Sequence, residues 1–238
     1  MRQLAASVPI RTAASGAQIA IPILTVQTTG DIGLGAALVA LALVPGIVAA
    51  PLVGALLDRA RRPRVLMMIA AAGTAAGTGV AAALGPVPVW AVAIALVLSG
   101  LLNPFGFGGL SSFVAPPGQD ARRAYALDAL SYNLSGVGGP ALVAVLAPTL
   151  GPRAALIAMA VIALISLAAY PLLPMPPRGA SGKGLFRSMA AGIVALSVRR
   201  RLAVVTVSGT VAEFGRGIMP IAAIGIAPED ITHVVITH

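Results

Sequence analysis

The chain has 238 residues, of which 58% are hydrophobic and only 10% are charged, and its mean hydropathy is +0.96. A soluble domain carries about 25% charged residues, so this composition excludes a soluble globular protein and predicts an integral membrane protein. The formal net charge of +9 does not indicate nucleic-acid binding, because the arginines lie between long apolar runs without interleaved aromatic residues. The chain has no cysteine, which excludes disulfides and thiolate metal sites.

Charge-free runs of about 20 residues, the length that crosses a bilayer as a helix, divide the chain. They predict an all-α membrane protein with a bundle of six transmembrane helices and a partial seventh span. The six expected spans are residues 9–28, entered past Arg11, then 33–57, 65–84, 89–113, 124–150 and 153–173. The expected domains are the bundle over 1–174, a basic cytoplasmic loop over 175–201, the seventh span over 202–227 and an atypical tail over 228–238.

The basic residues are distributed unevenly between the two sides of these spans. With the N-terminus inside, only Arg153 lies on the outer side, and this asymmetry predicts a cytoplasmic N-terminus. The strong preference for arginine over lysine indicates GC-rich bacterial coding, so we expect a bacterial inner membrane. The residues expected on the inner side are Arg2, Arg59, Arg61, Arg62, Arg64, Arg122, Arg123, Arg178, Lys183, Arg187, Arg199, Arg200 and Arg201.

The hairpin between the second and third spans reads GALLDRARRPRVL over residues 54–66. It resembles the G-x-L-x-D-R-x-G-R-R-x-x-L signature that major facilitator superfamily transporters carry in the same loop. Arg61 departs from the glycine usual there, and Pro63 from a basic residue. The resemblance implies a conformational latch that closes the inner side, whereas the alternative is a solvated turn that only sets topology. The latch residues would be Gly54, Asp58, Arg59 and Arg62.

A second pattern lies in the fifth span, where the sequence reads SYNLSGVGGPAL. Gly139 and Pro140 fall where export members of the superfamily carry a G-x8-G-x3-G-P-x2-G-G pattern, and small residues replace several of its other glycines. The resemblance implies a helix bend in an exporter. Simple helix packing explains small residues in a membrane helix equally well.

Charges within the spans are costly unless they pair or face water, so they are candidate functional residues. We expect Asp128 to pair with Arg122 or Arg123 at the inner edge, with a proton site as the alternative. Glu213 and Arg216 share one helical face and can neutralise each other, with a substrate-facing role as the alternative. Uncharged candidates for lining a pathway, or for hydrogen bonds between helices, are Gln18, Gln27, Asn103, Tyr132 and Asn133.

No sequence pattern indicates an enzyme, a cofactor or a metal site, since both histidines lie in the last six residues. The expected function is transport of a small molecule driven by an ion gradient, with a proton or another ion as partner and efflux as the direction that the fifth span implies. The alternative is a non-transporting membrane subunit or an inactive remnant. Transporters of this kind have two six-helix halves, so we expect a truncated or frameshifted chain, with a short protein that forms a homodimer as the alternative.

Overall fold

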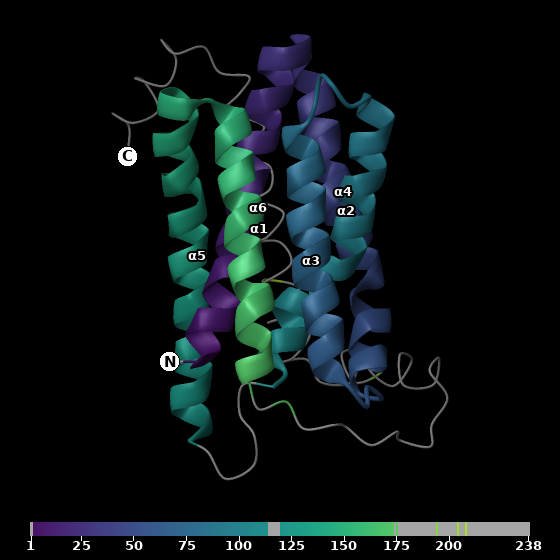
Figure 1. The fold of residues 1–238 in the computed structure, drawn as a ribbon. Coiled ribbons are helices and arrows are strands. Elements are labelled where there is room, and N and C mark those ends of the chain that lie inside the picture. The colour runs from purple at the N-terminus through teal and green to yellow at the C-terminus, as the bar shows by residue number, and fades with distance from the viewer. Residues whose placement is uncertain are drawn as a thin grey trace.

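A computed structural model describes residues 2–113, 120–173 and 175, together with the single residues 194, 204 and 208. Most of the expected loop over 175–201, most of the seventh span over 202–227, and the whole tail lie outside the described residues, as do Glu213 and Arg216. The described part of the chain forms helices connected by short turns (Figure 1). These elements are α1 (Arg2–Thr29), α2 (Ile32–Leu57), α3 (Pro63–Ala82), α4 (Val89–Pro104), the π-helical η1 (Phe105–Gly109), α5 (Ala121–Leu150), α6 (Pro152–Ala169) and the 3-10 helix η2 (Tyr170–Leu172).

Local sequence signals set the boundaries of these helices. Gly30 and Gly151 have positive φ angles of 71° and 89°, a backbone conformation that glycine adopts without steric cost. The Asp31 carboxylate accepts a hydrogen bond from the backbone N–H of Leu34 and caps the start of α2. These tight turns place α2 beside α1, and α6 beside α5, as antiparallel neighbours.

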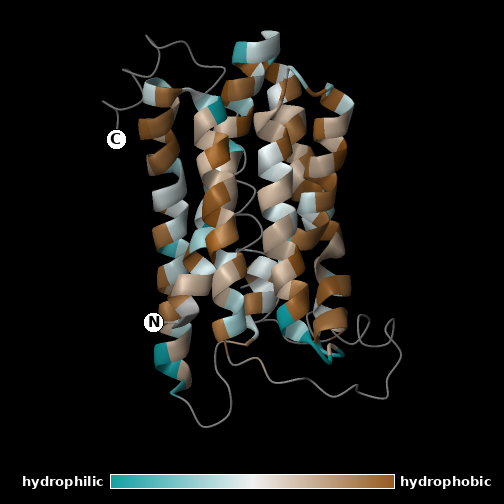
Figure 2. Ribbon diagram, viewed as in Figure 1, coloured by the Kyte–Doolittle hydropathy of each residue, from teal (hydrophilic) through white to brown (hydrophobic). Residues whose placement is uncertain are grey.

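The helix α1 packs against most of the other helices of the bundle, namely α2, α3, α5 and α6. These other helices contact one another in the order α5, α6, α3, α4 and α2. The inward side chains of α1 are mostly small, including Ala13, Ala17 and Ala20, which are at most 5% exposed. Large apolar side chains of the neighbouring helices are instead exposed on the outside of the bundle, and Figure 2 shows that many residues along these helices are hydrophobic.

Five helical segments of the described chain are long and apolar enough to cross a membrane: α2, α3, α4 with η1, α5, and α6 with η2. Their starts lie within three residues of the expected ones. The helix α1 runs alongside them through the bundle (Figure 1), but its sequence is more polar. Because its neighbours bury much of its length, α1 has little surface that must be apolar toward lipid.

The first helix departs from expectation at its N-terminal end. It begins at Arg2 instead of near residue 9, although Pro9 lies inside it. As a result Arg11, which we expected at the entrance to the span, lies within the helix and is 0% exposed. The expected fourth span is also not uniform, because its α-helix changes to the π-helix η1 after Pro104.

Two arginine side chains tie α3 to α6 at both ends of the bundle. Arg64, at the start of α3, donates from Nη2 to the carbonyl oxygen of Leu173 at 2.7 Å. Arg153, at the start of α6, donates from Nη2 to the carbonyl oxygen of Leu84 at 2.9 Å. Such hydrogen bonds from a charged donor are stronger than neutral ones, so the pair holds these two antiparallel helices in register.

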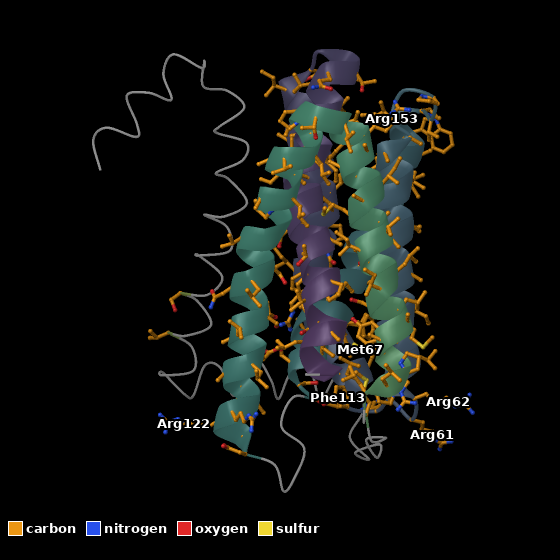
Figure 3. The ribbon with its side chains drawn as sticks, turned by 60° about the vertical axis from the view of Figure 1, so that its left-hand side comes forward. Arg61, Arg62, Met67, Phe113, Arg122 and Arg153 are labelled. Carbon is orange, nitrogen blue, oxygen red and sulfur yellow. The ribbon has the colours of Figure 1, made fainter. Side chains whose placement is uncertain are left out.

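Charge is segregated between the two ends of the bundle. Figure 3 shows Arg61, Arg62 and Arg122 at one end and Arg153 at the opposite end. The loop between α2 and α3 and the start of α5 are therefore on the same side of the bundle. This is the arrangement that the alternation of spans in the sequence predicts.

Candidate functional site

A buried arginine marks the candidate site. Arg11 is the largest of the fully buried side chains of the described chain, at 0% exposure. Its position in α1 lies roughly 14 Å along the helix axis from Arg2, at 1.5 Å per residue. A guanidinium ion at this depth requires partners, because an unpaired charge in a low-dielectric interior costs several kcal/mol.

The principal partner of Arg11 is Asp128 of α5. Nη1 of Arg11 lies 2.9 Å from Oδ1 of Asp128, and the two side chains are 1% and 11% exposed, respectively. The same Nη1 donates to the hydroxyl of Ser131, whose own proton is donated to the carbonyl oxygen of Asp128. One turn of α5 thus supplies both a charged and a neutral acceptor.

The other terminal nitrogen of Arg11 binds the helix that follows α4. Nη2 donates to Oγ of Ser111 at 2.9 Å and to the carbonyl oxygen of Phe107 at 3.3 Å. Phe107 lies in the π-helical segment η1, and π-helical turns in α-helices often mark functional sites because they change the pattern of backbone hydrogen bonds. The charge of Arg11 therefore links α5 to η1 through α1.

An aromatic ring completes the surroundings of the guanidinium. Its central carbon lies 3.7 Å from the ring centroid of Tyr132, close enough for a favourable cation–π interaction. Nε of Arg11 is buried and has no hydrogen-bond partner among the described residues. The other four N–H donors of the guanidinium are on Nη1 and Nη2, and both of these nitrogens have acceptors in α5 or near η1.

The prediction for Asp128 was correct about pairing and wrong about the partner. The carboxylate pairs with Arg11, whereas Arg122 and Arg123 are exposed. The physical reason is the position of each residue along α5. Arg122 and Arg123 lie near the end of the helix, where their side chains reach water, while Asp128 is about two turns further in and faces α1.

The other candidate residues of α5 are not part of the ion pair. Asn133 is exposed on the outside of the helix. Gly139 lies at a close crossing of α5 over α1, where a Cβ atom would approach the carbonyl oxygen of Thr12 to 2.5 Å and the backbone nitrogen of Gly16 to 2.6 Å. Pro140 follows within the same helix. The glycine therefore permits close helix packing.

The candidate latch residues lie on the loop end of α2. Asp58 is the C-terminal cap of α2 and is exposed, as is Arg62, whereas Arg59 is partly buried. Gly54 lies one turn before Asp58 and is also exposed, and a Cβ atom built there would meet no described heavy atom within 4 Å. Gly54 and Asp58, four residues apart, thus share an exposed face of α2.

Sequence reasoning missed Arg11, Ser111 and Ser131 as members of the site. A signal was present: an arginine within a run of small residues that can form one helix, and a single carboxylate inside the fifth span to balance it. The described residues contain no group of three or more histidine, cysteine or acidic side chains that could hold a metal ion. The interaction that the structure shows at the site is the ion pair of Arg11 and Asp128.

We predict that breaking one half of the ion pair destabilises the bundle strongly. Arg11→Met or Asp128→Leu leaves one buried charge without its partner and should lower the free energy of unfolding by about 3–5 kcal/mol. The double variant removes both charges and should lie within about 1–2 kcal/mol of the native protein. Unfolding in mixed micelles measures both quantities, and Arg122→Met, which removes an exposed arginine, should have little effect. Equal effects of Arg11→Met and Arg122→Met would contradict a structural ion pair.

The comparison with known proteins agrees with this arrangement of helices. The family model described as Major Facilitator Superfamily matches residues 4–227 of the chain. A search among curated proteins found no match. Because the family match extends over most of the sequence, and the described helices form a membrane-type bundle, the chain belongs to the major facilitator superfamily of membrane transporters.

Proposed function

We propose that this protein moves a small molecule across the membrane with the energy of a proton gradient, and that Arg11 and Asp128 couple the two movements. Membership of the superfamily supports membrane transport in general. The observation that supports the coupling role is the ion pair itself, with a separation of 2.9 Å in an apolar bundle. Among the described groups that contact Arg11, Asp128 is the one whose side chain loses its charge on binding a proton.

The two members of the pair differ in exposure. The side chain of Arg11 is 1% exposed, whereas that of Asp128 is 11% exposed. In the proposed mechanism the proton therefore reaches the carboxylate first, without prior withdrawal of the arginine. Proton binding converts the carboxylate to a neutral carboxyl group and leaves the positive charge of Arg11 without a counter-ion.

This loss of a counter-ion supplies the driving force for a conformational change. A buried unpaired guanidinium is less stable by several kcal/mol than a paired one, so protonation favours a state in which water reaches Arg11. The hydrogen bonds of Nη2 to Ser111 and Phe107 can persist, because neither acceptor binds the proton. The change therefore acts between α1 and α5.

The coupling proposal predicts that neutralising Asp128 reduces proton-driven accumulation but not counterflow. A panel of labelled small molecules is first tested for counterflow in proteoliposomes that contain the full chain, to identify a transported compound. Asp128→Asn should then reduce proton-driven accumulation of that compound at least about tenfold, the effect of losing about 1.4 kcal/mol or more of driving force. Counterflow, which needs no proton movement, should persist when it is expressed per folded and inserted protein, because removal of the carboxylate also lowers stability.

Asp120→Asn is the matched control for this experiment. Asp120 is an exposed carboxylate that caps the same helix, and asparagine is an equally good N-cap. It should leave both measurements unchanged. Proton-driven accumulation by Asp128→Asn at the native level would contradict coupling through this pair, and a correctly inserted chain that transports no compound would contradict transport itself.

We further propose that Asp58 acts in a latch at the loop end of α2 and that Gly139 and Pro140 belong to an export-type fifth helix. The exposed face that carries Gly54 and Asp58 supports the first proposal, because an approaching helix could pack there closely. The match to the export pattern supports the second, so efflux is the proposed direction.

The latch proposal predicts that Asp58→Asn slows transport without affecting insertion or stability. The side chain is exposed in this bundle, so its neutralisation removes little packing. Counterflow of the compound identified above should fall severalfold. Asp31→Asn, which neutralises the exposed carboxylate at the opposite end of α2, should have no such effect. Native transport rates in Asp58→Asn would show that this end of α2 only sets topology.

We propose that the N-terminus and the loop between α2 and α3 face the cytoplasm of a bacterial cell, with α1 as a further span. The gathering of Arg61, Arg62 and Arg122 at one end of the bundle supports this orientation. Reporter tags at Asp31 and at Arg61, which lie beyond opposite ends of α2, should be located outside and inside, respectively. Two tags on the same side of the membrane, or the reverse assignment, would contradict the proposal.

A further inference from the structure

A small polar pocket lies between α1, α2, α3 and α4. Its volume is about 30 Å³. No residue that contacts Arg11 lines it, so the pocket is separate from the ion pair. Its polar lining residues are Gln18, Thr74, Thr78, Ser99 and Asn103, and its other lining residues are apolar.

The polar groups around this pocket include acceptors that no described residue uses. The hydroxyl of Thr74 donates to the carbonyl oxygen of Ala70 at 3.0 Å, and that of Thr78 donates to the carbonyl oxygen of Thr74 at 2.8 Å. Each hydroxyl has one proton, so both oxygens retain lone pairs that can accept. Oδ1 of Asn103 is buried and has no partner among the described residues.

Close helix contacts prevent the pocket from collapsing. At Gly100 of α4, a Cβ atom would lie 2.6 Å from the carbonyl oxygen of Ala42 in α2. At Gly77 of α3, a Cβ atom would lie 2.6 Å from the Cβ of Ser99 in α4. The backbone of α4 is therefore already as near to α2 and α3 as packing allows, and it cannot move inward to fill the space.

An acceptor without a partner in such a place costs about 1–3 kcal/mol, so an occupant that donates hydrogen bonds is favoured. A pocket of about 30 Å³ is large enough for about two water molecules, since each needs roughly 10–15 Å³ of this kind of volume. No acidic side chain lines the pocket. These side chains do not suit a divalent cation, which is usually bound by carboxylate oxygens.

We propose that this pocket is a binding site for water, held by Asn103 and the two threonines. The bound water donates to Oδ1 of Asn103 and to the hydroxyl oxygens of Thr74 and Thr78. The proposal does not depend on the coupling role of Asp128.

Radiolytic footprinting of the native protein tests the proposal, with water itself as the probe. Water held beside a side chain generates hydroxyl radicals that oxidise it in place. Leu96 lines the pocket and is 2% exposed, whereas Leu156 is 0% exposed and lies in the apolar core away from the pocket. Leu96 should be oxidised about tenfold faster than Leu156, because bound water lies beside polar groups and apolar cores are dry. Equal rates for these two leucines would overturn the proposal.

Variants then test the chemistry of the site. Asn103→Leu removes the unpartnered acceptor and fills the pocket, so the oxidation rate of Leu96 should fall to that of Leu156. Asn133→Leu, the same substitution at an exposed amide on α5, should leave the rate of Leu96 unchanged. If Asn103→Leu does not fold, Thr78→Val removes an acceptor at nearly constant volume and should reduce the rate severalfold. An unchanged rate in Thr78→Val would then overturn the role of these acceptors.

Discussion

The cost of burying the charge of Arg11 is the constraint on which this bundle depends. The arginine is 0% exposed, and a charge at that depth is tolerated only when it is paired and hydrogen-bonded. Asp128 and Ser131 meet this requirement from α5, and the carbonyl oxygen of Phe107 in η1 and the hydroxyl of Ser111, two residues after η1, meet it from the other side. The positions of α5 and η1 relative to α1 are thus specified by chemistry, in a membrane interior where apolar contacts alone discriminate poorly between alternative helix arrangements.

Small residues make the necessary approach possible. Because α1 presents mostly alanine, serine and threonine to its neighbours, α5 can cross it closely at Gly139, where an added Cβ atom would meet the α1 backbone at 2.5 Å. Nearby, the Ser135 hydroxyl donates to the carbonyl oxygen of Val8 at 3.1 Å. A helix with larger side chains at these positions would hold α5 further away and would leave Arg11 short of Asp128. Packing and electrostatics therefore depend on each other along the contact between α1 and α5.

The sequence predicted those parts of the fold that depend on local signals. Charge-free runs and Gly-Pro breakers located α2 to α6, since a membrane span must be long and apolar and its turns must tolerate unusual backbone angles. The start of α1 was misplaced because Arg11 and Pro9 looked like a boundary, yet both are tolerated within a helix that other helices bury along much of its length. The partner of Asp128 was misassigned for a related reason. Arg122 and Arg123 are near in sequence, but pairing inside a bundle depends on which helix faces contact each other, and one sequence does not give those contacts.

The partners of Arg11 differ in a way that assigns different mechanical roles to the two contacts of α1. On the η1 side, the acceptors are a hydroxyl and a backbone carbonyl, which keep the same charge whatever the proton concentration. On the α5 side, the principal acceptor is a carboxylate, which loses its charge when it binds a proton. In the proposed coupling, a proton-dependent force on Arg11 therefore arises between α1 and α5. Asp128 lies roughly 16 Å along α5 from the crossing at Gly139, at 1.5 Å per residue. In the same proposal the tight crossing serves as a pivot, and a small rotation of α5 there separates Asp128 from Arg11 while the contacts of α1 with η1 remain in place.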